Sequence, residues 1–495
     1  MSIKPQYETY RYTGEVCRLH SQSMVECRLP GSEIGAVLAV QAVAMPTESA
    51  CADGEVRYGG KLFISIVYED GERNVYRAER GAEFFHKAEG SAVTPACFAK
   101  VAFNTDNVFT RREGSGLYVS VVVDAESVVY GGKQVEYLSG GEQVITKKEQ
   151  QQICKCVCVT GEVEGEDTFE TDYVGDVLMH TENVIATHVR ASAGQIEMEG
   201  ELALNVCVLK ADNSLCSYER IIPVRMQIPS EEAFGDLQAS ARVIVKSAQI
   251  DADVDEERGK SIVRFSYCLS ADCYLHAKDT IALVTDAFSP IAEIALKKVN
   301  DMGRYLTNST KFTERVSGVC SVSLDTDGEY VLVGALLPRG EMVCKKGDNG
   351  FEAEGAVLAQ LLFKGADGSY KTGALSLPFV FPLDVFGDSV EADVLVCGLN
   401  VRRRKDGQTE AEATLKVCLH SYVQTEWTYV QTLEEGDART EKDAAVSMYA
   451  LYVGETLWDI AKRLQCDPDE LVKSNPHLQF PVKQGESIFV YRQIK

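Results

Sequence analysis

Three cysteines at alternate positions form one group of possible metal ligands in the chain. Cys154, Cys156 and Cys158 lie in a stretch with the alternating pattern of a strand. Their thiols should share one face, because side chains two residues apart in a strand point the same way. Zinc sites usually join one pair of ligands, about two to four residues apart, to a second pair, and no second pair is evident here. We predict a cysteine-lined strand face without a metal, with zinc binding as the alternative.

Carboxylates at alternate positions raise a second metal hypothesis. Asp251, Asp253 and Asp255 have the spacing of the first ligands of a calcium loop. Such a loop needs glycine at its sixth position, where this chain has Glu256, and it needs a bidentate glutamate further on in register. We therefore predict a solvated strand end and turn, with calcium binding as the weaker alternative.

The sequence carries few signs of catalysis. It contains no Gly-x-Ser-x-Gly elbow, His-Glu-x-x-His helix, phosphate-binding glycine loop or dinucleotide fingerprint. We predict a protein that is not an enzyme and that needs no cofactor. The histidines occur singly: His20, His86, His180, His188, His276, His420 and His477.

The charge balance excludes some classes of partner. The 495 residues include 50 Lys and Arg against 74 Asp and Glu, a net charge of -24. A strongly acidic protein repels phosphate backbones and anionic lipid, so nucleic acid is a poor partner. The N-terminus lacks the apolar core of a signal peptide, and the apolar stretch Ile34 to Met45 is too short to span a membrane. We expect a cytosolic protein without a transmembrane segment, whose scattered cysteines are mostly reduced.

A repeat organises the residues before Met448. Strand-like blocks around Gly60, Gly200 and Gly355 each run on into a hairpin turn, and Pro223 and Pro378 share the same offset from their glycines. Each glycine should mark a bulge or bend in a long strand, where a side chain would obstruct pleat or packing. The sequence therefore predicts a mainly β protein with three related units.

A second hairpin-like pattern follows each block and sets the size of the units. Its clearest strands are Leu117–Tyr130, Ser261–Tyr274 and Glu410–Tyr422. Each unit is then of ordinary domain size. The predicted division is 1–145, 146–300 and 301–433 for three β-rich domains, 434–447 for a polar tether, and 448–495 for a separate C-terminal module.

The C-terminal module has a clear local pattern. A short strand around Tyr449 leads through Gly454 to Thr456, which is placed to cap a helix with apolar residues at helical spacing. Asp467 can cap a second helix that Pro468 begins. A last alternating run ends the chain, so the predicted order is strand, helix, helix, strand.

This tail resembles the LysM domain. It matches the family's opening Tyr-x-Val-x-x-Gly-Asp-Thr-Leu-Trp-x-Ile-Ala, the Asn-Pro after the second helix and the Gly-x-x-Ile of the closing strand, except that Glu455 replaces the usual Asp and Tyr452-Val453 the frequent Lys-Pro. The family binds N-acetylglucosamine glycans between two loops. The resemblance implies contact residues Gly454, Glu455, Thr456, Leu457, Trp458, Asn475, Pro476, His477, Leu478 and Gln479. For Trp458 the alternative is packing on its own helix.

The repeats resemble SPOCS domains of spore-coat-associated bacterial proteins. The features that carry this are Leu29-Pro30 and Leu337-Pro338 at the entry, Val67-Tyr68 in the central hairpin and Asp286-Ala287-Phe288-Ser289 at the exit. Three SPOCS domains followed by one LysM domain is the order found in clostridial spore-coat morphogenetic proteins. The resemblance implies a mother-cell scaffold at the forespore surface, whose LysM domain engages the basement-layer coat ATPase and through it other coat proteins. The alternative is a peptidoglycan-binding protein anchored by its LysM domain.

A basic cluster stands out in this acidic chain. Arg402, Arg403, Arg404 and Lys405 precede Asp406-Gly407, which suits a hairpin tip. A solvated turn is the simpler interpretation, and contact with an acidic partner is the alternative.

Overall fold

The protein is described by a computed structural model. It covers residues 2–30, 34–113, 116–171, 175–210, 212–235, 237–255, 257–320, 322, 330–348, 350–404, 408–439, 446–479 and 486–491. This part of the chain forms twenty strands and two short helices, as expected for a mainly β protein. Neither helix has the length and apolar character that crossing a membrane requires.

The first eighteen strands form three units of six, which together make the body of the protein. The first unit has β1 (Lys4–Pro30), β2 (Ala36–Ala52), β3 (Glu55–Glu69), β4 (Val75–Glu89), β5 (Phe98–Glu113) and β6 (Gly116–Glu142). The second has β7 (Ile145–Thr171), β8 (Gly175–Ser192), β9 (Gln195–Lys210), β10 (Leu215–Pro229), β11 (Gln238–Asp255) and β12 (Lys260–Phe288). The third has β13 (Ala292–Cys320), β14 (Tyr330–Gly347), β15 (Gly350–Gly365), β16 (Tyr370–Leu383), β17 (Ser389–Arg403) and β18 (Thr409–Ala438).

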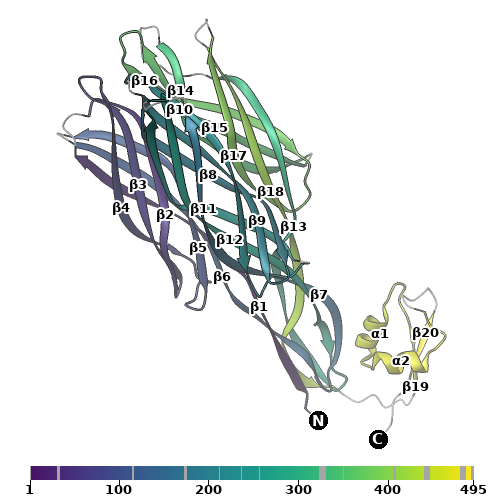
Figure 1. Ribbon diagram of the computed structural model, residues 1–495. Coiled ribbons are helices and arrows are strands. Elements are labelled where there is room, and N and C mark those ends of the chain that lie inside the picture. Colours follow the sequence, from purple (N-terminus) through teal and green to yellow (C-terminus); the bar gives the residue numbers. More distant parts are fainter. Residues whose placement is uncertain are drawn as a thin grey trace.

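All three units have the same topology. The first strand pairs with the sixth and the sixth with the fifth, while the second, third and fourth strands form a separate meander. The sheet orders are β1-β6-β5 with β2-β3-β4, β7-β12-β11 with β8-β9-β10, and β13-β18-β17 with β14-β15-β16. Figure 1 shows the units side by side, with long strands of all three converging toward the end where the N-terminus lies.

Strands run across the predicted domain limits, by the most residues at the two limits of the third unit. β13 begins at Ala292, so the limit between 146–300 and 301–433 falls inside this strand. β18 continues to Ala438, where the charged residues assigned to the tether 434–447 pair with the start of β13: Ala438 lies opposite Ala292, and Glu435 opposite Ile294. A polar, aperiodic run can thus be a strand when a partner strand supplies its hydrogen bonds. Residues 440–445 of the tether lie outside the described part.

The three repeat glycines occupy the same position in their units. Gly60 pairs with Phe84, Gly200 with Val224 and Gly355 with Phe379. A Cβ at Gly200 would collide with the carbonyl oxygen of Ile185, and one at Gly355 with that of Glu341. The strand next to Gly60 has a bulge between Pro46 and Glu48, and the strand next to Gly200 has one between Ala186 and His188. The glycine therefore serves close packing, and the bulge expected in its own strand belongs to the adjacent one.

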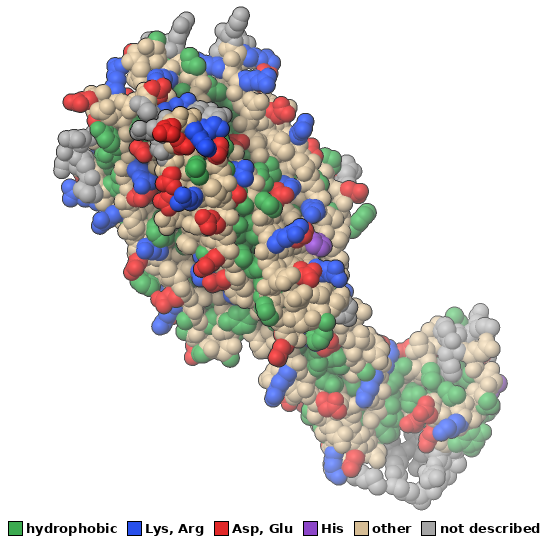
Figure 2. Space-filling model, viewed as in Figure 1, with side chains coloured by type: hydrophobic (Ala, Val, Ile, Leu, Met, Phe, Trp, Pro, Cys, Tyr) green, Lys and Arg blue, Asp and Glu red, His purple; other side chains and the backbone are tan. Residues whose placement is uncertain are grey.

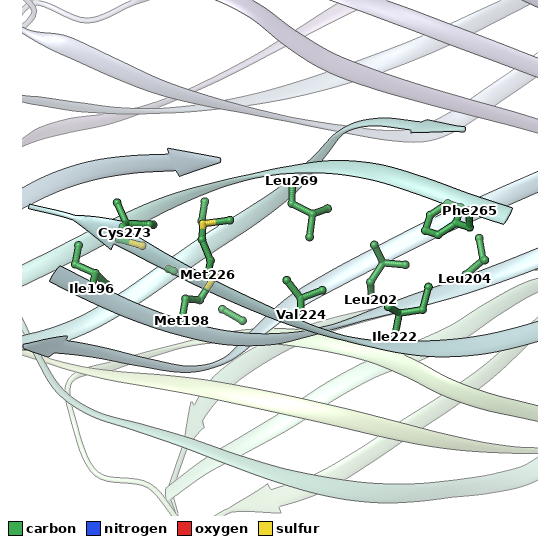
Figure 3. Packing of buried hydrophobic residues seen from close by; sticks show 14 of the residues in the cluster. Ile196, Met198, Leu202, Leu204, Ile222, Val224, Met226, Phe265, Leu269 and Cys273 are labelled. Atoms are coloured by element: carbon green, nitrogen blue, oxygen red, sulfur yellow. The ribbon is translucent and has the colours of Figure 1, made fainter. Parts of the chain in front are cut away.

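Each unit buries its core between its two sheets. In the second unit, alternate residues of β9 and β10 meet β12 across the sandwich, as Figure 3 shows for Met198, Leu202, Val224 and Leu269. Phe265 is fully buried among them. Each large apolar side chain removed from water contributes about 1.5–3 kcal/mol, so a core of this size stabilises its own unit.

The units also share cores along a common axis. The sixth strands β6, β12 and β18 contact one another. At the end formed by the meander turns, Val67, Cys207 and Leu362 lie at the same offset from their glycines and pack into one cluster. We call this the apical cluster; it comprises Leu38, Ala39, Val67, Val75, Leu178, Met179, Cys207, Leu215, Leu336, Leu362 and Tyr370.

Candidate functional site

The C-terminal module contains every contact residue that the LysM resemblance implies. It has β19 (Val446–Ala450), α1 (Leu457–Leu464), α2 (Pro468–Ser474) and β20 (Ser487–Tyr491), which gives the predicted order strand, helix, helix, strand. β19 and β20 are antiparallel neighbours. Its small core comprises Leu451, Ile460, Ala461, Leu464, Leu471, Ile488 and Val490.

The first predicted contact loop is held by a helix cap. Gly454 has a φ of 87°, a left-handed conformation that favours glycine. Thr456 caps α1: its hydroxyl accepts from the Asp459 amide at 3.3 Å, and the Asp459 carboxylate accepts from the Thr456 amide at 3.0 Å. The Thr456 hydroxyl also donates to the Asp459 carboxylate, and this bond, with the one from the Thr456 amide, holds the pKa of Asp459 below its ordinary value. Leu457 begins α1 and packs partly on the module core.

Glu455 is also engaged inside the module. Its carboxylate accepts from the Tyr452 amide at 2.7 Å and from two nitrogens of Arg463 at 2.9 Å each. A bidentate arginine pair is among the stronger hydrogen-bonded contacts. Glu455 therefore has a structural partner on α1.

The exposed part of this loop is its apolar tip. Tyr452 and Val453 keep 68% and 69% of their surface exposed. The Arg463 guanidinium lies over the Tyr452 ring, 5.1 Å from its centroid. Tyr452 and Val453 precede the predicted range and are the side chains at this loop most available to a partner.

The second predicted contact loop begins with a structural residue. Asn475 is buried, and its amide nitrogen donates to the Leu471 carbonyl at 3.0 Å and to the Phe489 carbonyl at 2.7 Å. Its oxygen accepts from the Phe489 amide at 2.8 Å, so Asn475 joins the end of α2 to β20. Of the remaining predicted residues, Pro476, His477 and Gln479 are exposed and Leu478 packs partly on the core. Residues 480–485, which precede β20, lie outside the described part of the chain.

Trp458 faces the body. Its indole nitrogen donates to Asp286 at 2.9 Å, and its ring meets Phe288 edge to face at 5.2 Å between centroids. Lys462, one turn further along α1, also donates to Asp286, at 2.6 Å. We call these contacts the seat of the module. Figure 2 shows hydrophobic side chains on both sides of this junction.

Asp286 is the polar centre of the seat. Burial alone would raise its pKa, but hydrogen bonds from Lys462 and Trp458 and the nearby charge of Lys298 outweigh burial, so the pKa lies below its ordinary value. The carboxylate is therefore ionised at neutral pH. The sequence indicated Asp286 and Phe288 only as part of the segment that ends a repeat. Their neighbours in the sequence do not show that they contact a helix far along the chain.

The three cysteines lie along β7. Cys156 pairs with His276 and Cys158 with Tyr274 on β12. Burial raises the pKa of Cys154, of Cys156 and of Cys158, the last to about 12, so the thiols stay protonated and poor metal ligands. Among the residues that the structure describes, no group of three or more His, Cys, Asp or Glu is arranged to hold a metal ion.

The two charged clusters have ordinary partners where they are described. Asp253 on β11 pairs with Arg264 at 2.7 Å, and Glu256 lies outside the described part. Arg403 ends β17 and its guanidinium donates to the Tyr330 carbonyl, while Arg404 pairs with Glu410. Residues 405–407 of the basic cluster lie outside the described residues.

No family model, curated protein or solved structure matches this chain at a significant level.

Proposed function

We propose that the protein is a non-enzymatic scaffold for spore-coat assembly. Three SPOCS-like units form its body, and a LysM-like module carries the docking tip. In this proposal it works in the mother-cell cytosol at the forespore surface, where the module engages the basement-layer coat ATPase and so recruits other coat proteins. The observation that carries the proposal is the exposed pair Tyr452 and Val453 on a module whose Trp458 is turned toward the body.

The body suits a scaffold because its units are tied to one another. Lys100 of the first unit pairs with Asp272 of the second at 2.7 Å, and Arg18 of the first pairs with Glu391 of the third at 2.7 Å. With the shared apical cluster, these contacts favour one fixed arrangement of the units. A fixed body presents the docking tip at a defined place, which assembly of an ordered layer requires.

An exposed aromatic and aliphatic pair suits a protein partner. Protein interfaces concentrate their binding energy in a few aromatic or aliphatic anchors. Tyr452 brings a hydroxyl and a large apolar face to the tip, and Val453 extends that face.

The exposed ring of Tyr452 also supports the second candidate, a peptidoglycan-binding protein. Aromatic rings stack on the apolar faces of sugars, and the exposed Pro476 and His477 belong to the second loop of the implied glycan groove. In that case N-acetylglucosamine glycan, and not a coat protein, would occupy the tip.

Co-purification from sporulating cells tests the proposal. The full-length chain is compared with the double variant Tyr452→Ser/Val453→Ser. The control is Phe386→Ser, which removes an apolar side chain that is 86% exposed on the body. We expect the double variant to lose the coat ATPase and its associated coat proteins, and Phe386→Ser to retain them. Retention by the double variant would contradict the proposal.

A parallel assay separates the two candidates. Both variants and the intact chain are incubated with purified peptidoglycan. If peptidoglycan retains the intact chain and Phe386→Ser but not the double variant, the result would favour the glycan-binding alternative.

A further inference from the structure

A cavity of about 770 Å³ lies where the three units meet. Small-molecule sites in proteins occupy about 300–1,000 Å³, so the central cavity is large enough for a ligand. All three units contribute to its lining, among others through Tyr12, Arg18, His276, Arg304, Glu391 and Trp427.

His276 is the first sign that this cavity has a role beyond packing. Its side chain is only 6% exposed, and neither ring nitrogen has a hydrogen-bond partner among the described residues. Its ring instead meets the ring of Tyr422 edge to face at 5.8 Å between centroids. A buried polar group without a hydrogen-bond partner lowers the stability of the fold, so packing alone does not explain a histidine at this position.

Two further unpartnered groups line the same cavity. The Tyr12 hydroxyl and the Trp427 indole nitrogen are buried and have no hydrogen-bond partner in the described part of the chain. Their rings meet edge to face at 6.4 Å between centroids. Native proteins leave few such groups, so their concentration around one cavity points to a role beyond packing. Their polar atoms are closed to solvent, and a ligand would reach them by displacing the side chains that cover them.

Most of the charged side chains that line the cavity are already paired. Glu391 accepts from Arg18 at 2.7 Å and from Arg304 at 2.6 Å, and Glu126 pairs with Arg242 at 3.3 Å. A charged ligand would have to compete with these contacts. The lining therefore does not favour a strongly anionic or cationic ligand.

The unpartnered groups are themselves neutral. Burial, together with the nearby charge of Arg304, lowers the pKa of His276 to about 4. At neutral pH one ring nitrogen therefore donates and the other accepts, while the Trp427 indole only donates and the Tyr12 hydroxyl does either. Hydroxyl groups match this set because each both donates and accepts, and the aromatic rings suit the apolar faces of a sugar.

We propose that the central cavity binds an uncharged, hydroxyl-rich molecule of the size of a short saccharide. His276, Tyr12 and Trp427 provide its hydrogen bonds, and the paired arginines keep the lining electrically balanced. The site is separate from the contact loops of the C-terminal module.

Ligand-detected saturation-transfer NMR on the full chain tests this proposal. The uncharged probes are glucose, maltose, trehalose and myo-inositol, each at about 1 mM, and the charged probes are glucose 6-phosphate and gluconate. We expect at least one uncharged probe to bind and the charged probes not to bind. Failure of all four uncharged probes, or preference for a charged one, would overturn the proposal.

Two substitutions place the binding in the cavity. Tyr12→Phe removes only the unpartnered hydroxyl, and His276→Phe removes both nitrogens while keeping a ring. Each should weaken binding by about tenfold or more, whereas Tyr137→Phe, which removes a buried hydroxyl that donates to Glu8 outside the cavity lining, should leave binding unchanged.

The module variant Tyr452→Ser/Val453→Ser controls for binding elsewhere and should also bind normally. Circular dichroism confirms that each variant is folded. Unchanged binding in Tyr12→Phe would overturn the proposal, as would loss of binding in the module variant.

Discussion

Two of the places where the three units meet contrast with each other. At the apical cluster, each unit contributes apolar residues from equivalent positions, such as Val67, Cys207 and Leu362. At the central cavity the contributions differ: the second unit supplies His276, while the first and third supply the ion pair of Arg18 with Glu391. The cavity still has one repeated feature, because Tyr130, Tyr274 and Tyr422, which lie on the corresponding strands β6, β12 and β18, all line it. Beside these tyrosines the units contribute different polar and charged groups.

This difference separates residues that stabilise the body from residues whose presence stability does not explain. An apolar cluster of equivalent residues is explained fully by burial. A buried histidine without partners lowers stability and therefore needs another reason to be present. The comparison predicts opposite responses to substitution at the two places.

The largest effect is expected at the apical cluster. Leu362→Ala removes a fully buried side chain from a cluster to which all three units contribute, so it should lower the free energy of unfolding by about 3 kcal/mol. Urea denaturation measures this, with the exposed Val331→Ala as the control, which should change stability by less than about 0.5 kcal/mol. A loss below about 1 kcal/mol at Leu362 would show that the cluster does not join the units.

The pH dependence of stability should identify the central cavity. His276 is held neutral in the folded state with a pKa of about 4, against 6.5 as its ordinary value. As the pH falls from 6.5 to 4, the unfolded chain binds a proton that the folded chain does not, so stability is lost. The loss amounts to roughly 3 kcal/mol.

Denaturation of the wild type and of His276→Phe across this pH range checks the prediction. The charged or titratable groups near His276 include Arg18 on β1, Cys156 on β7, Arg304 and Tyr305 on β13, Glu391 on β17, and His420 and Tyr422 on β18. These groups remain in both proteins, so the difference in slope belongs to His276. Equal slopes would contradict the assignment.

A smaller effect is expected from the ion pair that lines the cavity. Glu391→Gln removes the charge between Arg18 and Arg304 and should lower the free energy of unfolding by about 1–2 kcal/mol. This loss lies between those expected for buried and for exposed ion pairs, because Glu391 keeps 40% of its side-chain surface exposed. Thermal denaturation measures the loss, and Glu142→Gln, which breaks an exposed pair with Lys4, provides the control. Equal losses in both variants would show that the cavity pair behaves like a surface pair.

The smallest effect on stability is expected at the seat of the module. Asp286→Asn weakens the contacts with Trp458 and Lys462, so the module should detach while the body unfolds as before. Small-angle scattering should then report a larger radius of gyration than that of the wild type. An unchanged radius would mean that other contacts hold the module.

Acid should have the same effect as Asp286→Asn. Because the pKa of Asp286 lies below 3.8 in the folded state, the stabilisation of the seat is fully present above about pH 4 and is lost as the pH falls through the lowered value.

Local patterns in the sequence predicted the mainly β class, the repeat and the caps of both helices. Thr456 and Asp467 cap α1 and α2 as their positions indicated. The pattern did not predict that β18 would extend to Ala438, because only pairing with β13 makes that polar run a strand.

The contacts between distant parts of the chain could not be predicted in the same way. Trp458 and Asp286 are 172 residues apart, and Arg18 and Glu391 are 373 apart. Periodicity shows which face of an element is buried but not which other element covers it. His276 was visible only as one of seven scattered histidines until the three units were placed together.

The most direct test of the contrast between the two places is the stability of His276→Phe without any added ligand at pH 7. If His276 is kept for binding at the expense of stability, the substitution should raise the free energy of unfolding by about 1 kcal/mol in urea denaturation. A decrease of similar size would show that His276 supports the fold, and would contradict the account of the central cavity.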